Sequence, residues 1–102
     1  MLELAYENTG ISQKVIGEIR SLAKKYCLEQ VKLFGSRARG DYKQRSDIDL
    51  AVCGGDVCRF TLAVEEETST LLKFDVVDLG ASVQAELLES IESEGRVIYE
   101  KI

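Results

Sequence analysis

The sequence has no histidine, no proline and no tryptophan, and it has only three cysteines. Without histidine there is no imidazole base, which excludes Ser-His-Asp and Cys-His catalytic triads. The odd number of cysteines, without paired spacing, favours reduced thiols over a disulfide framework or a zinc site. A metal ion held by side chains would therefore rest on oxygen ligands, which Mg²⁺ and Mn²⁺ prefer.

Long apolar runs are also missing. No stretch approaches the roughly 20 residues that a membrane-spanning helix needs. The first residues, MLELAYENTG, lack the basic segment and apolar stretch of a signal peptide. We therefore expect a cytoplasmic protein with no membrane partner. The length of 102 residues suits one small domain, spanning residues 1–102.

Charge is distributed unevenly along the chain, whose net charge is −5. Residues 1–51 carry nine Lys/Arg and seven Asp/Glu, whereas residues 52–102 carry four and eleven. This acidic excess argues against direct nucleic-acid binding. Four cations nevertheless gather in the short segment 37–45: Arg37, Arg39, Lys43 and Arg45. A local basic loop on an acidic protein suits a small polyphosphate better than a duplex.

Hydrophobic periodicity predicts alternating helices and strands. The expected strands are 31–34, 47–53, 74–79 and 96–102, and the expected helices are 12–26, 56–72 and 82–94, with room for one helical turn after Gly35. Ser12 and Ser82 are expected as N-caps, and Gly95 is expected at the C′ position of the last helix. This order predicts an α/β (α+β) fold, with a small mixed sheet of about four strands and helices packed mainly on one face.

Two aspartates interrupt the second predicted strand. Side chains alternate along a strand, so Asp47 and Asp49 face the same way, with Cα atoms about 6–7 Å apart. That spacing allows them to share divalent cations, although they could also face solvent and pair with nearby arginines. A third carboxylate, Asp75 or Asp78, lies in the next strand, which would run about 4.8 Å from the second if the two are neighbours.

The Gly35-Ser36 pair follows the first predicted strand. Glycine lets the backbone approach a ligand closely, the amides of the turn can point at phosphate oxygens, and Ser36 adds a hydroxyl donor. Three carboxylates beside such a turn describe a two-metal phosphoryl-transfer site.

The stretch GSRARGDYKQRSDIDL resembles the signature of the DNA polymerase β-like nucleotidyltransferases, in which Gly-Ser and Asp-x-Asp are separated by ten residues. GSRARGDY and SDIDLAV are similar in particular to the minimal nucleotidyltransferases (MNT). The likeness continues through FDVVDL and EGRVIYE, so it covers residues 11–100. It implies the polymerase β-like core fold.

The resemblance also implies roles for individual residues. Gly35 and Ser36 would bind the triphosphate, and Asp47 and Asp49 would ligate two Mg²⁺ ions. Asp75 matches the position of the third carboxylate, which would ligate the catalytic metal and help to deprotonate the acceptor.

Three further residues have two interpretations each. Asp78 is the alternative third carboxylate, but it faces opposite to Asp75 and could instead cap the following turn. Arg37 and Arg39 are candidate phosphate contacts, because a guanidinium fork matches phosphate geometry. Alternatively, both arginines are solvated and pair with a carboxylate such as Asp41.

Minimal nucleotidyltransferases resemble antitoxins whose partner is a helical HEPN-type toxin. The resemblance implies transfer of AMP from ATP, the nucleotide substrate, to a tyrosine of that toxin. We expect the acceptor to lie on a partner or to be small, because the chain ends after its last predicted strand. The alternative is a non-catalytic module that neutralises the toxin by occlusion. The acidic second half is either a docking face for a basic partner or a solvated surface.

Overall fold

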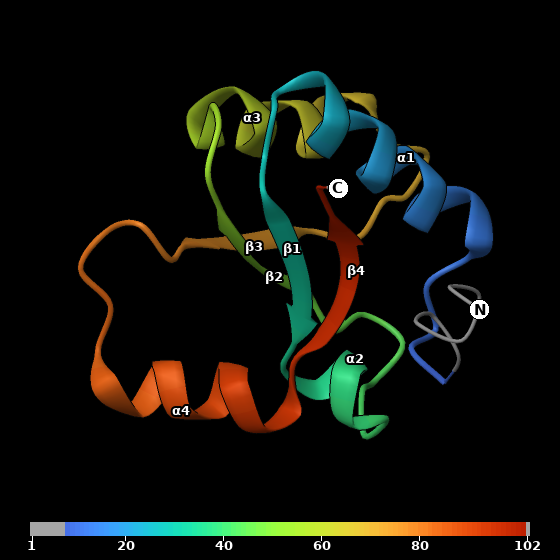
Figure 1. Cartoon of the computed structure of the whole chain (residues 1–102). Helices are drawn as coiled ribbons and strands as arrows, with labels where there is room; N and C mark the ends of the chain where they lie inside the picture. The colour runs from blue at the N-terminus through green and yellow to red at the C-terminus, as the bar shows by residue number, and fades with distance from the viewer. Residues whose placement is uncertain (1–7, 102) are drawn as a thin grey trace.

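The structure is a computed structural model and describes residues 8–101. These residues form four helices and four strands (Figure 1). In chain order they are α1 (Gln13–Lys25), β1 (Gln30–Phe34), α2 (Ser36–Arg39), β2 (Ile48–Cys53), α3 (Val57–Glu67), β3 (Phe74–Asp78), α4 (Ala85–Glu94) and β4 (Arg96–Glu100). Every predicted strand and helix is present, and α2 is the single turn expected after Gly35. None of the helices in residues 8–101 is both long and apolar enough to cross a membrane.

The strands form one mixed sheet in the order β3-β2-β1-β4. β2 and β3 are parallel, whereas β1 is antiparallel to both β2 and β4. The carboxyl end of β1 therefore meets the amino ends of β2, β3 and β4 at one end of the sheet. The predicted fold class, a small mixed sheet in an α/β protein, is confirmed.

The main core lies between one face of the sheet and the helices α1 and α3. Ser12 caps α1 as predicted, because its hydroxyl accepts a hydrogen bond from the Val15 amide (3.2 Å). The helix buries Val15, Ile16, Ile19, Leu22 and Ala23, which recur at helical spacing. These side chains meet Val31, Leu33, Ile48, Leu50 and Val52 of the sheet.

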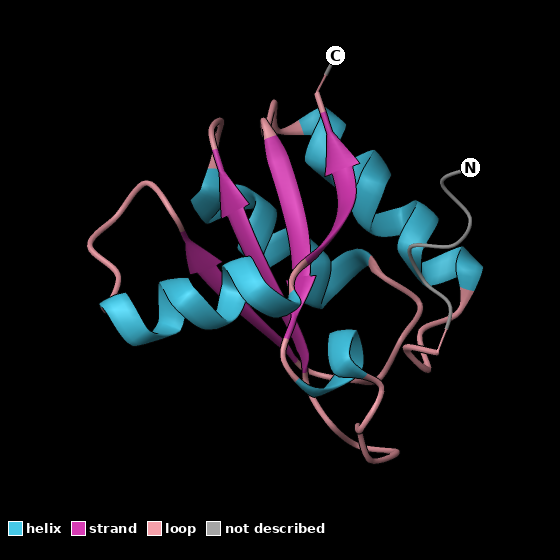
Figure 2. Ribbon diagram, turned by 60° about the horizontal axis from the view of Figure 1, so that its bottom comes forward, coloured by secondary structure: helices cyan, strands magenta, loops and turns pink. Residues whose placement is uncertain are grey.

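The fourth helix covers the opposite face, as Figure 2 shows by the position of α4 in front of the strands. A smaller cluster joins Ile91 of α4 to Phe34 of β1 and Ala51 of β2. The expectation that helices pack mainly on one face therefore holds for α1 and α3, while α4 makes a second layer. Along β2, Ile48 and Leu50 belong to the main core and Ala51 to the smaller cluster, as strand alternation requires.

The predicted end of the last helix at residue 94 is confirmed, whereas its predicted N-cap and the predicted C′ conformation of Gly95 need correction. The N-cap is Gln84 rather than Ser82, because residues 78–81 form a turn in which the Ala81 amide donates to the Asp78 carbonyl (3.1 Å). Gly95 has φ −67°, so it is not a left-handed C′ residue. Its glycine identity reflects close approach instead, since a Cβ there would lie 2.3 Å from the Ile91 carbonyl oxygen.

Candidate active site

Three carboxylates meet at the end of the sheet where β2 and β3 begin. Asp49 lies directly opposite Asp75 in the β2–β3 register, and Asp47 immediately precedes β2. The neighbours of Asp49 in β2 and of Asp75 in β3 belong to the main core, so both carboxylates point to the face that α4 covers. Asp49 is half-buried, whereas Asp47 and Asp75 are exposed. The predicted Asp-x-Asp pair is thus joined by Asp75.

The carboxylate of Asp49 is in an electrostatically unfavourable position. Burial, followed by the negative charges of Asp75 and Asp47, raises its pKa from 3.8 to about 6. Arg39 opposes this rise but does not cancel it, and Glu94 adds to it. The cluster therefore carries more negative charge than its protein surroundings compensate, which is the condition that a bound cation relieves.

The donor set suits Mg²⁺ in its chemistry, because all three candidate ligands are carboxylates. Among residues 8–101, no three His, Cys, Asp or Glu side chains are grouped closely enough to hold a metal ion as they stand. A magnesium ion commonly takes one or two protein carboxylates and completes its shell with water and substrate phosphates. The cluster fits that mode of binding.

Gly35 brings the backbone into contact with the carboxylates. Its φ is +78°, and a Cβ at this position would lie only 2.1 Å from Asp49 Oδ2. Both conditions exclude a larger residue without rearrangement. Ser36 begins α2 directly beside this contact and is half-buried. The predicted phosphate turn and the predicted metal ligands are therefore adjacent.

Arg37 does not lie as either interpretation predicted. It is only 1% exposed, and its guanidinium donates to the carbonyls of Ser46 (3.0 Å), Thr9 (2.8 Å) and Gln44 (3.1 Å). Its guanidinium also lies over the Tyr42 ring, 4.8 Å from the centroid. As placed, Arg37 braces the loop that leads into Asp47 instead of facing solvent or a ligand. Nothing local in the sequence separates this arginine from its basic neighbours.

Arg39 lies beside the carboxylates and is exposed. It forms ion pairs with Asp41 (3.2 Å) and with Glu94 (3.1 Å). Hydrogen bonds from Arg39 to Glu94 and then to Asp41 raise the pKa of the guanidinium. The predicted pairing with Asp41 is therefore present, and the guanidinium also lies at the site, since its second partner, Glu94, accepts a hydrogen bond from the Gly35 amide.

Sequence reasoning missed Glu94. The Gly35 amide donates to Glu94 Oε1 (3.0 Å), across 59 residues of sequence. Glu94 is one of four glutamates in α4, and no local pattern distinguishes it from the others. The contact arises because α4 ends where the carboxyl end of β1 meets the amino end of β4.

Asp78 lies away from the carboxylate cluster. It pairs with Val52, near the opposite end of β2, and its carboxylate accepts from the Gly80 amide (2.8 Å). Asp78 therefore caps the turn after β3, as the alternative interpretation proposed. Lys43 and Arg45 are exposed.

A groove of about 770 Å³ opens beside the cluster. We call it the Leu71 groove; it is lined by Gln44, Arg45, Asp47, Thr70, Leu71, Leu72 and Lys73. Leu71 is fully exposed (101%), so an apolar side chain is accessible to solvent in the same groove as Asp47, a candidate metal ligand.

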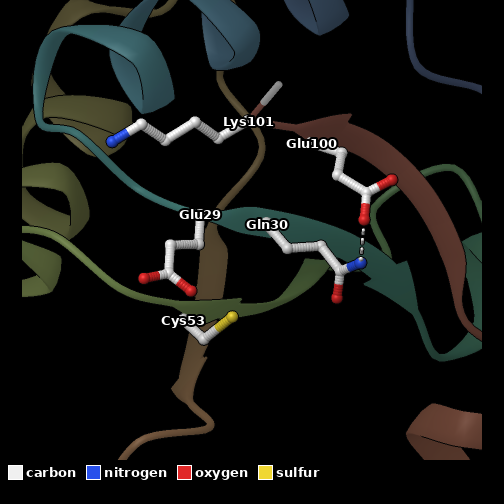
Figure 3. A pocket seen from close by; sticks show the side chains of 5 residues that line it. All are labelled: Glu29, Gln30, Cys53, Glu100 and Lys101. Carbon is white, nitrogen blue, oxygen red and sulfur yellow. Dashed lines mark hydrogen bonds between the residues drawn. The ribbon is translucent and has the colours of Figure 1, made fainter.

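Another hollow, of about 480 Å³, lies at the other end of the sheet (Figure 3). It is lined by Glu29, Gln30, Cys53, Glu100 and Lys101, and Gln30 donates to Glu100 across it (3.2 Å). The length of β2 separates it from Asp47 and Asp49.

Comparison with known proteins agrees with this geometry. The family described as "Polymerase beta, Nucleotidyltransferase" matches residues 17–102. A relative from Methanocaldococcus jannaschii, provisionally named a protein adenylyltransferase, is 38% identical over 100 residues, covering 85% of this chain and 97% of its own.

Two solved structures have the same fold. A toxin–antitoxin structure with AMP-PNP aligns with a TM-score of 0.69 at 23% identity, covering 84% of this chain and 73% of its own. A provisionally named nucleotidyltransferase from Sulfolobus solfataricus aligns with a TM-score of 0.57 at 27% identity, covering 95% of this chain and 87% of its own. The chain therefore belongs to the polymerase β-type nucleotidyltransferase family, and it is a nucleotidyltransferase.

Proposed function

We propose that this nucleotidyltransferase transfers AMP from ATP to a hydroxyl group of a partner protein, with Mg²⁺ as cofactor. The observation that carries the proposal is the pairing of Asp49 with Asp75 beside the Gly35 turn, with Asp47 immediately before β2 at the same end of the sheet. The name of the relative from Methanocaldococcus jannaschii supports a protein as the acceptor.

In this proposal the acceptor oxygen attacks the α-phosphorus of ATP. The bond between the α-phosphorus and its bridging oxygen breaks, and pyrophosphate leaves with that electron pair. The hydroxyl proton passes to the carboxylate of Asp75, which is exposed and therefore accessible to an acceptor. Bound magnesium ions would supply positive charge against the triphosphate and the developing alkoxide. The turn at Gly35 and Ser36 holds the phosphates, and Arg39 adds a cation at the same place.

The acceptor enters through the Leu71 groove. This groove borders Asp47 and combines two leucines, Leu71 and Leu72, with two cations, Arg45 and Lys73. Tyrosine suits this groove, because its apolar ring can pack against the leucines while its hydroxyl lies near the carboxylate of Asp47.

The partner is a toxin, and the protein acts as its antitoxin. Structural neighbours described as toxin–antitoxin complexes, among them MntA–HpeT, support a toxin as partner. The sequence resemblance supports a helical HEPN-type toxin as its class and a tyrosine as the modified residue.

Intact-mass spectrometry tests the proposal. The protein encoded beside this one is incubated with it, ATP and MgCl₂. We expect a mass increase of one or more AMP units, abolished by Asp47→Asn or Asp75→Asn and kept by Asp78→Asn. Asp78→Asn is the matched control, since it removes a carboxylate of the same strand at the far end of the register.

Two outcomes would contradict the proposal. A tight complex without any adduct would favour neutralisation by occlusion. An adduct that survives Asp47→Asn and Asp75→Asn would disprove the assignment of these carboxylates.

A further inference from the structure

The groups expected to bind phosphate already hold a carboxylate of the chain itself. Oε1 of Glu94 accepts from the Gly35 amide at 3.0 Å. Both of its carboxylate oxygens lie 3.1 Å from Arg39 Nη1. The side chain of Glu94 is only 19% exposed, so it is folded against these donors rather than extended into solvent.

A carboxylate and a phosphate compete for such donors. Both are anions that accept hydrogen bonds through oxygens at similar distances. The Gly35 amide has one hydrogen, and it cannot make a full hydrogen bond to Glu94 and to a phosphate oxygen at once. A phosphate oxygen can therefore take the Gly35 amide only if the Glu94 side chain moves.

The position of Glu94 in the fold is unfavourable for a carboxylate in two ways. Glu94 is the last residue of α4, where the partial negative charge of the helix end repels an anion. It also adds to the negative charge that raises the pKa of Asp49. The contacts to Gly35 and Arg39 are what offset this repulsion, so a ligand that takes those contacts also releases Glu94.

We propose that Glu94 is an internal competitor for the triphosphate, which holds the phosphate-binding donors of Gly35 and Arg39 until the nucleotide displaces it. This inference rests on the proposed function of the site. Its consequence is quantitative, because the apparent dissociation constant equals the intrinsic one divided by the fraction of molecules in which the donors are free. If Glu94 is docked in about nine molecules of ten, removing it should tighten binding about tenfold.

Isothermal titration calorimetry with α,β-methylene-ATP and MgCl₂ measures this effect without turnover. The variants are Glu94→Ala and Glu94→Gln, and the matched control is Glu92→Ala, which removes an equal charge from an exposed position of α4. We expect Glu94→Ala to lower the Kd about tenfold and Glu92→Ala to leave it within twofold. Glu94→Gln should lie between, because its amide oxygen still accepts from Gly35.

The possible failures can be told apart. Equal Kd values for the wild type, Glu94→Ala and Glu92→Ala would overturn this inference and leave the proposed function standing. Weaker binding in Glu94→Ala would also overturn it, and would indicate that Glu94 helps to hold the nucleotide or its metal. No binding by any variant would overturn the proposed function and this inference together.

NMR of the wild-type protein, observing backbone amides and side-chain carboxyl carbons, gives a second test that needs no variant. Saturation with the same nucleotide should shift the Gly35 amide and the side-chain carboxyl carbon of Glu94, as the hydrogen bond between them breaks. A shift of Gly35 with an unchanged Glu94 carboxyl signal would overturn the inference even if Glu94→Ala failed to fold.

Discussion

The half-buried carboxylate of Asp49 leads to a prediction about stability. Asp49→Asn removes the charge and nearly preserves the shape of the side chain. In metal-free protein we expect this variant to be more stable than the wild type at pH 8. At pH 4 the two proteins should be almost equally stable.

The sign and the size of this difference in stability follow from the raised pKa of Asp49, which is about 6 instead of the ordinary 3.8. The folded protein binds a proton more tightly than the unfolded chain, so stability falls as the pH rises from about 4 to 6 and stays low above that. A difference of about 2 pKa units corresponds to about 3 kcal/mol if unscreened. Because the side chain is only half-buried, solvent screening reduces the expected gain to about 1–2 kcal/mol.

Thermal unfolding in EDTA, followed by circular dichroism, measures the gain. For a domain of this size, 1–2 kcal/mol corresponds to a rise in Tm of about 5–15 °C at pH 8. Asp56→Asn is the control, since this exposed carboxylate caps α3 beyond the opposite end of β2 and asparagine also caps helices. Without EDTA, excess MgCl₂ should reduce the difference in Tm between the variant and the wild type, because a bound cation offsets the charge of Asp49, which only the wild type has. A variant that is no more stable than the wild type at pH 8 would refute the reasoning.

Two further substitutions test the roles of a buried and an exposed residue. Arg37→Ala should destabilise the protein by about 2–4 kcal/mol in chemical denaturation, because it removes a buried guanidinium that donates to the buried Thr9 carbonyl and to the part-buried carbonyls of Gln44 and Ser46. Arg39→Ala, at an exposed position, should leave the Tm nearly unchanged, and equal effects of the two substitutions would contradict the bracing role of Arg37. Leu71→Ala should lower kcat/KM for transfer to the partner about tenfold, from about 1.5 kcal/mol of apolar burial, without changing the Tm. The control is Leu62→Ala, on the exposed side of α3, and the same loss of transfer in both variants would count against the Leu71 groove as the acceptor site.

The sequence predicted the helices and strands because these depend on local patterns. Helical periodicity marked the buried face of α1, and Ser12 was recognisable as its cap. Strand alternation predicted that Asp47 and Asp49 share a face, but Asp47 lies immediately before β2, so alternation within the strand governs only Asp49. Glycine followed by serine after the first predicted strand indicated a turn, and Gly35 lies between β1 and α2 with a φ of +78°.

The choice between Asp75 and Asp78 needed the pairing of two strands. Both aspartates lie in β3, and the sequence leaves the β2–β3 register open. Only the register places Asp75 beside Asp49 and Asp78 beside Val52. A shift of two residues would preserve every buried face and would still move a different residue to the cluster.

The contacts of the charged side chains also depended on tertiary structure. Arg37 and Arg39 are two residues apart in one basic loop, yet one is buried among carbonyls and the other is exposed beside Glu94. Glu94 reaches Gly35 only because α4 crosses the second face of the sheet and ends at the carboxyl end of β1. Sequence patterns located the glycine turn and the candidate carboxylates Asp47, Asp49 and Asp75, but not Glu94. The packing of segments distant in the chain decided which of those groups meet, because long side chains take the partners that the surrounding backbone brings within reach.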